Sequence, residues 1–211
     1  MEIKKPRRPA IIEPETLEYL EGEEDPALSS ESAHTSARIL IRANRGEWSD
    51  PDPETKARLL GYIEAQGIDE LAELWANSPA DTLPGTLWRL HLIHGWVTDF
   101  ATGVDLRFHQ GLNSPQLSKY LDVAGAHTLD FLAWKQDLGD IFAGDFNAEF
   151  ADFLDESSAV LRVLAASEST WLKPGQSKRL EHQVTTRDNA LLNTADELLQ
   201  AATLYRESRL D

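Results

Sequence analysis

The chain has 211 residues, 41% of them hydrophobic, and it contains no cysteine. This length and composition are sufficient for one domain with a buried core. Without cysteine the chain has no disulfide, no thiolate metal ligand and no catalytic thiol. The formal net charge is −16, and an acidic body repels phosphate at long range, which argues against a nucleic-acid partner.

The sequence gives no sign of a membrane segment. It has no run of about 18 apolar residues, and the N-terminal "MEIKKPRRPAIIEPETLEY" follows its basic residues with proline and glutamate rather than with the apolar core of a signal peptide. We therefore expect a cytoplasmic protein with no membrane partner.

The first part of the chain divides into an arm and a group of short helices. Residues 1–33 combine several prolines, an acidic run and serines, which predicts a flexible N-terminal arm with at most one short helix, around residues 15–20. Residues 34–80 form a subdomain of short helices in "SARILIRANRGEW", "SDPDPETKARLLGYIEAQG" and "IDELAELWANSP".

Residues 81–211 repeat apolar side chains at spacings of three and four, which is typical of helices with one buried face. Four long helices are expected, beginning after Pro84, Pro115, Gly144 and the "KPG" of residues 173–175, with connections at 111–115, 139–145 and 172–176. We predict an all-α fold in which these helices form an up-down bundle, packed with residues 34–80 as one globular unit.

Several glycines fall inside these helical patterns, at Gly95, Gly103, Gly125 and Gly139. A glycine inside an exposed helix costs about 1 kcal/mol relative to alanine. Close approach of two helices, a kink or room for a ligand would each explain them, and close approach is the commonest reason.

One level of the predicted bundle gathers possible metal ligands. If the chain turns near residue 112, a rise of about 1.5 Å per residue places His94 and Asp130 at the same height. Continuing the turns brings further groups to this level, and the candidate ligands are His91, His94, His127, Asp130, Glu156 and Asp188. Against a metal site, the Glu-x-x-His pair of di-iron bundles is absent from the long helices. Histidines bonded to carboxylates in or beside the core are the simpler interpretation.

Basic residues cluster in "WLKPGQSKRLEH", where Lys173, Lys178 and Arg179 are the candidates for an anion contact at one tip of the bundle. With the basic residues of the arm, they are the basis of a nucleic-acid alternative. The sequence contains no phosphate-binding loop, no dinucleotide fingerprint, no nucleophile elbow and no His-Glu-x-x-His motif. We therefore assign no catalytic residue.

The segment "LPGTLWRLHLIHGW", together with the overlapping "DTLPG", resembles a group of uncharacterised all-helical proteins of actinobacteria, over residues 80–110. The resemblance implies a bacterial cytoplasmic protein, and no functional residue is carried over from it.

The sequence favours a non-catalytic helical protein for interaction or regulation. It would bind a protein partner through a helix face or through the groove between the short-helix subdomain and the bundle. Self-association as a two-fold homodimer is as compatible with the pattern as a monomer. No cofactor is expected. Two alternatives stay open: a helical-bundle enzyme that uses a divalent metal or small ligand at the His/carboxylate layer, and a nucleic-acid-associated protein that uses the arm and the tip at residues 173–179.

Overall fold

The computed structural model describes residues 26–42, 53–167 and 188–211. The regular elements of these residues are all helices and none is a strand, so the predicted all-α class is confirmed. The elements are α2 (Pro26–Arg42), α3 (Pro53–Gln66), α4 (Ile68–Glu73), α5 (Leu83–Asp99), α6 (Ala101–Leu112), the short 3-10 helix η1 (Leu117–Lys119), α7 (Val123–Ala126), α8 (Phe131–Ala143), α9 (Phe150–Ala166) and α10 (Asp188–Arg206).

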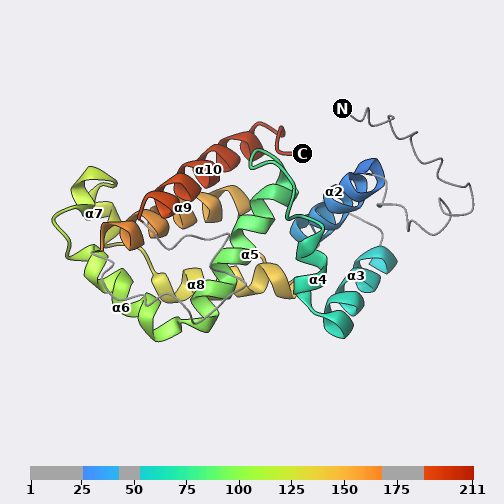
Figure 1. Cartoon of the computed structure of the whole chain (residues 1–211), viewed down its shortest axis with the longest axis horizontal. Helices are drawn as coiled ribbons and strands as arrows, with labels where there is room; N and C mark the ends of the chain where they lie inside the picture. The colour runs from blue at the N-terminus through green and yellow to red at the C-terminus, as the bar shows by residue number, and fades with distance from the viewer. Residues whose placement is uncertain (1–25, 43–52, 168–187) are drawn as a thin grey trace, which may run out of the picture.

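Helix α9 is the centre of the molecule. It lies side by side with α10, and α6, α7, α8 and η1 also pack on it (Figure 1). Most of its residues are buried, including Phe150, Leu154 and Leu161. Helix α5 contacts α10, α8 and α6. Helices α2 and α4 also pack on α5, on the right in Figure 1. No described helix has the length and apolar character needed to cross a membrane.

Two buried tryptophans are tied to serines inside the core. Trp134 of α8 donates its Nε1–H to Ser157 Oγ of α9 at 2.9 Å. Trp75, which follows α4, donates to Ser36 Oγ of α2 at 3.0 Å. All four side chains are buried, and a buried indole N–H without an acceptor would be costly. These bonds therefore fix α8 on α9, and the α4 region on α2.

The first helices differ from the sequence prediction at their boundaries. Helix α2 begins at Pro26, so residues 26–33, which we assigned to the arm, are helical. Helices α3 and α4 fall where the second and third short helices were expected. The short helix expected around residues 15–20 lies outside the described residues.

The long helix expected after Pro115 is wrong as a single element. Its place is taken by η1, α7 and α8, because two aspartates start new helices. Asp122 accepts a hydrogen bond from the Gly125 amide at 2.7 Å, and Asp130 accepts from the Leu132 and Ala133 amides at 3.2 and 3.0 Å. Capping of this kind favours a helix start at that residue over continuation through it.

The other long helices are shorter than expected. The helix from Pro84 is interrupted at Phe100, which separates α5 from α6. The helix after Gly144 starts only at Phe150, so Phe146 is buried just before it. The last helix is described from Asp188 onward, and its expected earlier part lies outside the described residues.

Close backbone approach occurs at Gly85 and Gly111. A Cβ on Gly111 would collide with the carbonyl oxygen of Val163 in α9, and a Cβ on Gly85 would collide with that of Pro79. Gly139, one of the glycines noted in the sequence, has no such conflict, because the nearest atom to its added Cβ is His94 Nε2 at 4.0 Å. The glycines that allow tight packing are therefore at the start of α5 and the end of α6.

Candidate functional site

A groove of about 300 Å³ lies where the connection between α4 and α5 meets α5 and α10. The sequence predicted partner binding between the short-helix subdomain and the long helices. This groove has such a position, because its lining comes from the connection after α4 and from α5 and α10. Its principal lining side chains are Ser78 from the connection, Trp88, Arg89 and Leu92 from α5, and Asn193 and Glu197 from α10.

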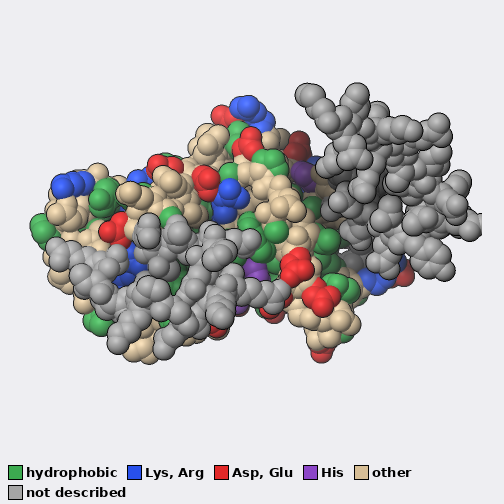
Figure 2. Space-filling view, viewed as in Figure 1, with side chains coloured by type: hydrophobic (Ala, Val, Ile, Leu, Met, Phe, Trp, Pro, Cys, Tyr) green, Lys and Arg blue, Asp and Glu red, His purple; other side chains and the backbone are tan. Residues whose placement is uncertain are grey.

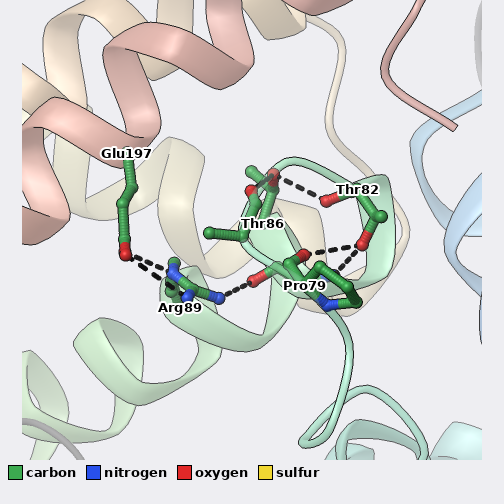
Figure 3. A network of polar contacts seen from close by, with 7 residues as sticks. Pro79, Thr82, Thr86, Arg89 and Glu197 are labelled. Atoms are coloured by element: carbon green, nitrogen blue, oxygen red, sulfur yellow. Dashed lines mark hydrogen bonds and ion pairs between the residues drawn. The ribbon is translucent and has the colours of Figure 1, made fainter.

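A charged pair closes one side of the groove. Arg89 Nε donates to Glu197 Oε2 at 2.5 Å and so joins α5 to α10 (Figure 3). The same guanidinium donates through Nη1 to the carbonyl oxygen of Gly85 at 2.9 Å. Side-chain exposure is 22% for Arg89 and 38% for Glu197, so the pair is partly shielded and its geometry is held by an additional bond.

The connection that forms the neighbouring wall is also held by hydrogen bonds. Thr82 Oγ1 donates to the carbonyl oxygen of Pro79 at 2.7 Å and accepts from the Gly85 amide at 3.2 Å. Thr86 Oγ1 donates to the carbonyl oxygen of Thr82 at 2.9 Å (Figure 3). Thr82 thereby caps the N-terminus of α5. These bonds hold the connection at the start of α5, next to the residues that line the groove.

The groove combines apolar and polar surface. Trp88 is half-buried and stacks on His91, with ring centroids 5.8 Å apart. Leu92 and Leu191 continue the apolar surface, whereas Asn193 is exposed beside it. An apolar floor with exposed amide and hydroxyl groups at its edge suits a polypeptide segment that inserts an apolar side chain and hydrogen-bonds through its backbone.

Two of the three histidines proposed as metal ligands, His91 and His94, lie together on α5, but their carboxylate neighbour was not predicted. His91 Nε2 is 3.3 Å from Oδ1 of Asp69, which belongs to α4. The rings of His91 and His94 pack on Phe142 of α8, at centroid distances of 5.6 and 5.3 Å. Burial lowers the pKa of His94, and the Asp69 carboxylate partly opposes this. The pair therefore joins α4, α5 and α8.

The remaining candidate ligands lie in other places. Asp130 caps α8, and exposed His127 ends α7. Burial raises the pKa of Glu156, and the carboxylates of Asp137 and Asp130 raise it further. Asp188 accepts a hydrogen bond from Arg107 Nη2 at 3.1 Å.

In the part of the chain that the structure describes, no three His, Asp or Glu side chains are placed to hold a metal ion. The predicted level assumed a continuous helix from Pro115 through Asp130, and this helix is replaced by shorter elements. Counting residues along the expected helix therefore does not give the positions of His127 and Asp130.

The predicted anion contacts Lys173, Lys178 and Arg179 lie outside the described residues. On the face shown in Figure 2, the described Lys and Arg side chains are dispersed among acidic ones and form no single patch. Several of them are paired with carboxylates: Lys135 with Asp105, Arg162 with Asp196, and Arg206 with Asp152 and Asp155.

Arg107 is a residue of interest that the sequence reasoning missed. Its side chain is 1% exposed, and its Nε donates to the Leu164 carbonyl oxygen at 2.9 Å and to Ser167 Oγ at 3.0 Å. The available signal was its position on α6 between Val104 and Gly111, on the face that also carries Phe108. A charged residue on a buried helix face is uncommon unless its charge is paired.

No family model matches this chain, and no curated protein or solved structure matches it either.

Proposed function

We propose that the protein is a non-catalytic interaction protein that binds a segment of a protein partner in the groove between the α4–α5 connection and α10. The observation that carries the proposal is the groove itself, which combines the apolar side chains of Trp88 and Leu92 with the exposed amide of Asn193. Its position also agrees with the sequence expectation of binding between the short helices and the remainder of the fold.

The size and chemistry of the groove support a peptide segment. A volume of about 300 Å³ is at the lower limit for small-molecule sites and is sufficient for one or two inserted side chains. Arg89 and Glu197 neutralise each other, so the groove offers hydrogen bonds and apolar contact in place of an unopposed charge. An apolar anchor surrounded by polar contacts is the usual arrangement of a binding hot spot.

The charge of the protein indicates the kind of partner. The net charge of −16 attracts a basic protein at long range and accelerates its association. We therefore expect the bound segment to carry an apolar side chain flanked by lysine or arginine, with the apolar group against Trp88 and Leu92.

The test compares two substitutions on α10 that add the same charge. Asn193→Arg places a long side chain at the groove, whereas Gln200→Arg makes the same change in charge at an exposed position outside the groove lining. Partners are first cross-linked to the wild-type protein in the native cell and identified. The purified partner segment is then titrated against all three proteins by calorimetry.

We expect Asn193→Arg to raise the Kd by about tenfold or more, because the longer charged side chain would obstruct the groove, and Gln200→Arg to leave it within about twofold. Equal binding of the segment by both variants would show that the groove is not the site. Turnover of a small molecule by the pure protein would contradict the non-catalytic assignment.

A further inference from the structure

A second cavity, of about 310 Å³, lies at the break between α5 and α6. Its polar lining comes from Trp96, Thr98 and Asp99 at the end of α5, and from Thr102 and Arg107 of α6. It shares no lining residue with the groove between α5 and α10. A ligand of this cavity would therefore bind at a separate site.

The start of α6 contributes hydrogen-bond donors to this cavity. The first intrahelical bond of α6 runs from the Val104 amide to the Phe100 carbonyl oxygen, at 2.9 Å. The amides of the first turn precede it and have no acceptor within the helix. Phe100 makes no side-chain capping bond, and the first turn contains no acidic residue. Ala101, Thr102 and Gly103 line the cavity, and their amides form the positive end of the helix dipole.

An independent sign of a missing acceptor comes from Trp96. This residue is part of the cavity lining and is 3% exposed, and its buried Nε1–H has no hydrogen-bond acceptor in the described structure. The buried tryptophans Trp75 and Trp134 both donate to serine hydroxyls. An unsatisfied donor in a core that satisfies the equivalent groups indicates an acceptor that the described residues do not supply.

Arg107 adds a buried guanidinium to the lining. Its guanidinium lies 5.6 Å from the centre of the Trp96 ring, and hydrogen bonds to Leu164 and Ser167 hold it in position. Asp188, with 43% side-chain exposure, is its ionic partner. Asp99 is exposed and is the acidic group of the cavity lining.

We propose that this cavity binds an oxyanion, either a phosphate or a carboxylate group of a small molecule. The acceptor oxygens would meet the first-turn amides of α6 and the Trp96 indole N–H, beside the guanidinium that Arg107 shares with Asp188. Phe100, Val104 and the Trp96 ring would contact an apolar portion of the same molecule. In such a ligand the oxyanion would match the hydrogen-bond donors of the cavity, and the apolar portion would match its apolar side chains.

The experiment follows the indole Nε1–H resonance of Trp96 and the amides of Ala101, Thr102 and Gly103 by NMR. The full-length protein is titrated with inorganic phosphate and, separately, with acetate, at constant ionic strength maintained with sodium chloride. Two variants of an exposed position in the first turn are titrated in parallel, Ala101→Glu and Ala101→Gln. A glutamate here places a negative charge at the helix N-terminus, which favours the helix while it repels an anion. Glutamine has the same size without the charge.

We expect saturable shifts of these resonances in the wild-type protein, and the probe that produces them identifies the head group as phosphate or carboxylate. Ala101→Glu should raise the Kd by about tenfold or more, and Ala101→Gln should keep it within about threefold. The absence of a saturable shift with both probes, or equal weakening by the two variants, would overturn the proposal. If Ala101→Glu does not fold, the pair Thr102→Glu and Thr102→Gln makes the same comparison.

Discussion

Two helical glycines give opposite predictions for the same substitution. Gly111 of α6 faces the Val163 carbonyl of α9 so closely that an added Cβ collides with backbone, which cannot rotate away as a side chain can. Gly139 of α8 has 4.0 Å of space before His94 Nε2. Neither residue has a positive φ, so the difference between them comes from packing alone.

Gly111→Ala should lower the free energy of unfolding by about 1–3 kcal/mol, the usual cost of overpacking. Gly139→Ala should raise it by about 0.5–1 kcal/mol, because alanine loses less backbone entropy on entering a helix. The assay is urea unfolding followed by circular dichroism, with the free energy extrapolated to water. Gly61→Ala is the control for helix propensity, since no atom lies within 4 Å of its added Cβ. A Gly111→Ala protein as stable as the wild type would refute the close approach of α6 to α9.

Three further predictions concern buried and half-buried polar groups. Ser157→Ala leaves the Trp134 indole N–H without its acceptor, and urea unfolding should show a loss of about 1–3 kcal/mol; a neutral result would show that water replaces the serine. The pKa of Glu156 is raised in the folded protein. Its favourable contribution to the free energy of unfolding is therefore present below the ordinary pKa of 4.5, and it is lost as pH rises through the folded pKa. Glu156→Gln should therefore be more stable than wild type at pH ~7 and lose this advantage near pH ~4, and the same difference at both pH values would contradict the assignment. The lowered pKa of His94 acts in the opposite direction, so stability is full above the ordinary value of 6.5 and falls as pH drops through the folded pKa. His94→Gln should reduce the slope of unfolding free energy against pH below 6.5, and an unchanged slope would exclude His94 as its source.

Helix content was predictable because it rests on local patterns. The sequence "DTLPG" marks the start of α5, where Thr82 caps the first turn, and the spacing of apolar residues identifies the buried face of α9. These signals depend on neighbours within one or two turns of the chain. They can therefore be identified without knowledge of the tertiary structure.

Helix interruption was predictable in one case and not in the other. Asp122 and Asp130 are good capping residues, and their presence in an apolar periodic segment was a usable signal for the restarts at α7 and α8. The break at Phe100 has neither a proline nor a capping side chain. No local rule identifies it.

The proposed metal ligands show how boundary errors propagate. Counting residues from an assumed turn places His94 opposite Asp130, but each boundary error of one residue rotates a side chain by about 100°. The carboxylate that does lie beside His91 is Asp69, on a short helix outside the counted bundle. Contacts between distant segments of this kind need the arrangement of α4 on α5, which periodicity alone does not contain.

The break at Phe100 and the buried polar groups of Trp96 and Arg107 meet at one cavity. An uninterrupted helix would use the amides of Ala101, Thr102 and Gly103 in its own ladder, whereas the break frees them. At the same place Trp96 has a buried N–H without an acceptor in the described structure, and Arg107 is held under the surface by bonds to α9 and Ser167. Donors without an acceptor cost stability when they are buried. A bound oxyanion at the α5–α6 junction would accept from the freed amides and from the Trp96 indole N–H, and it would therefore stabilise the fold at this place.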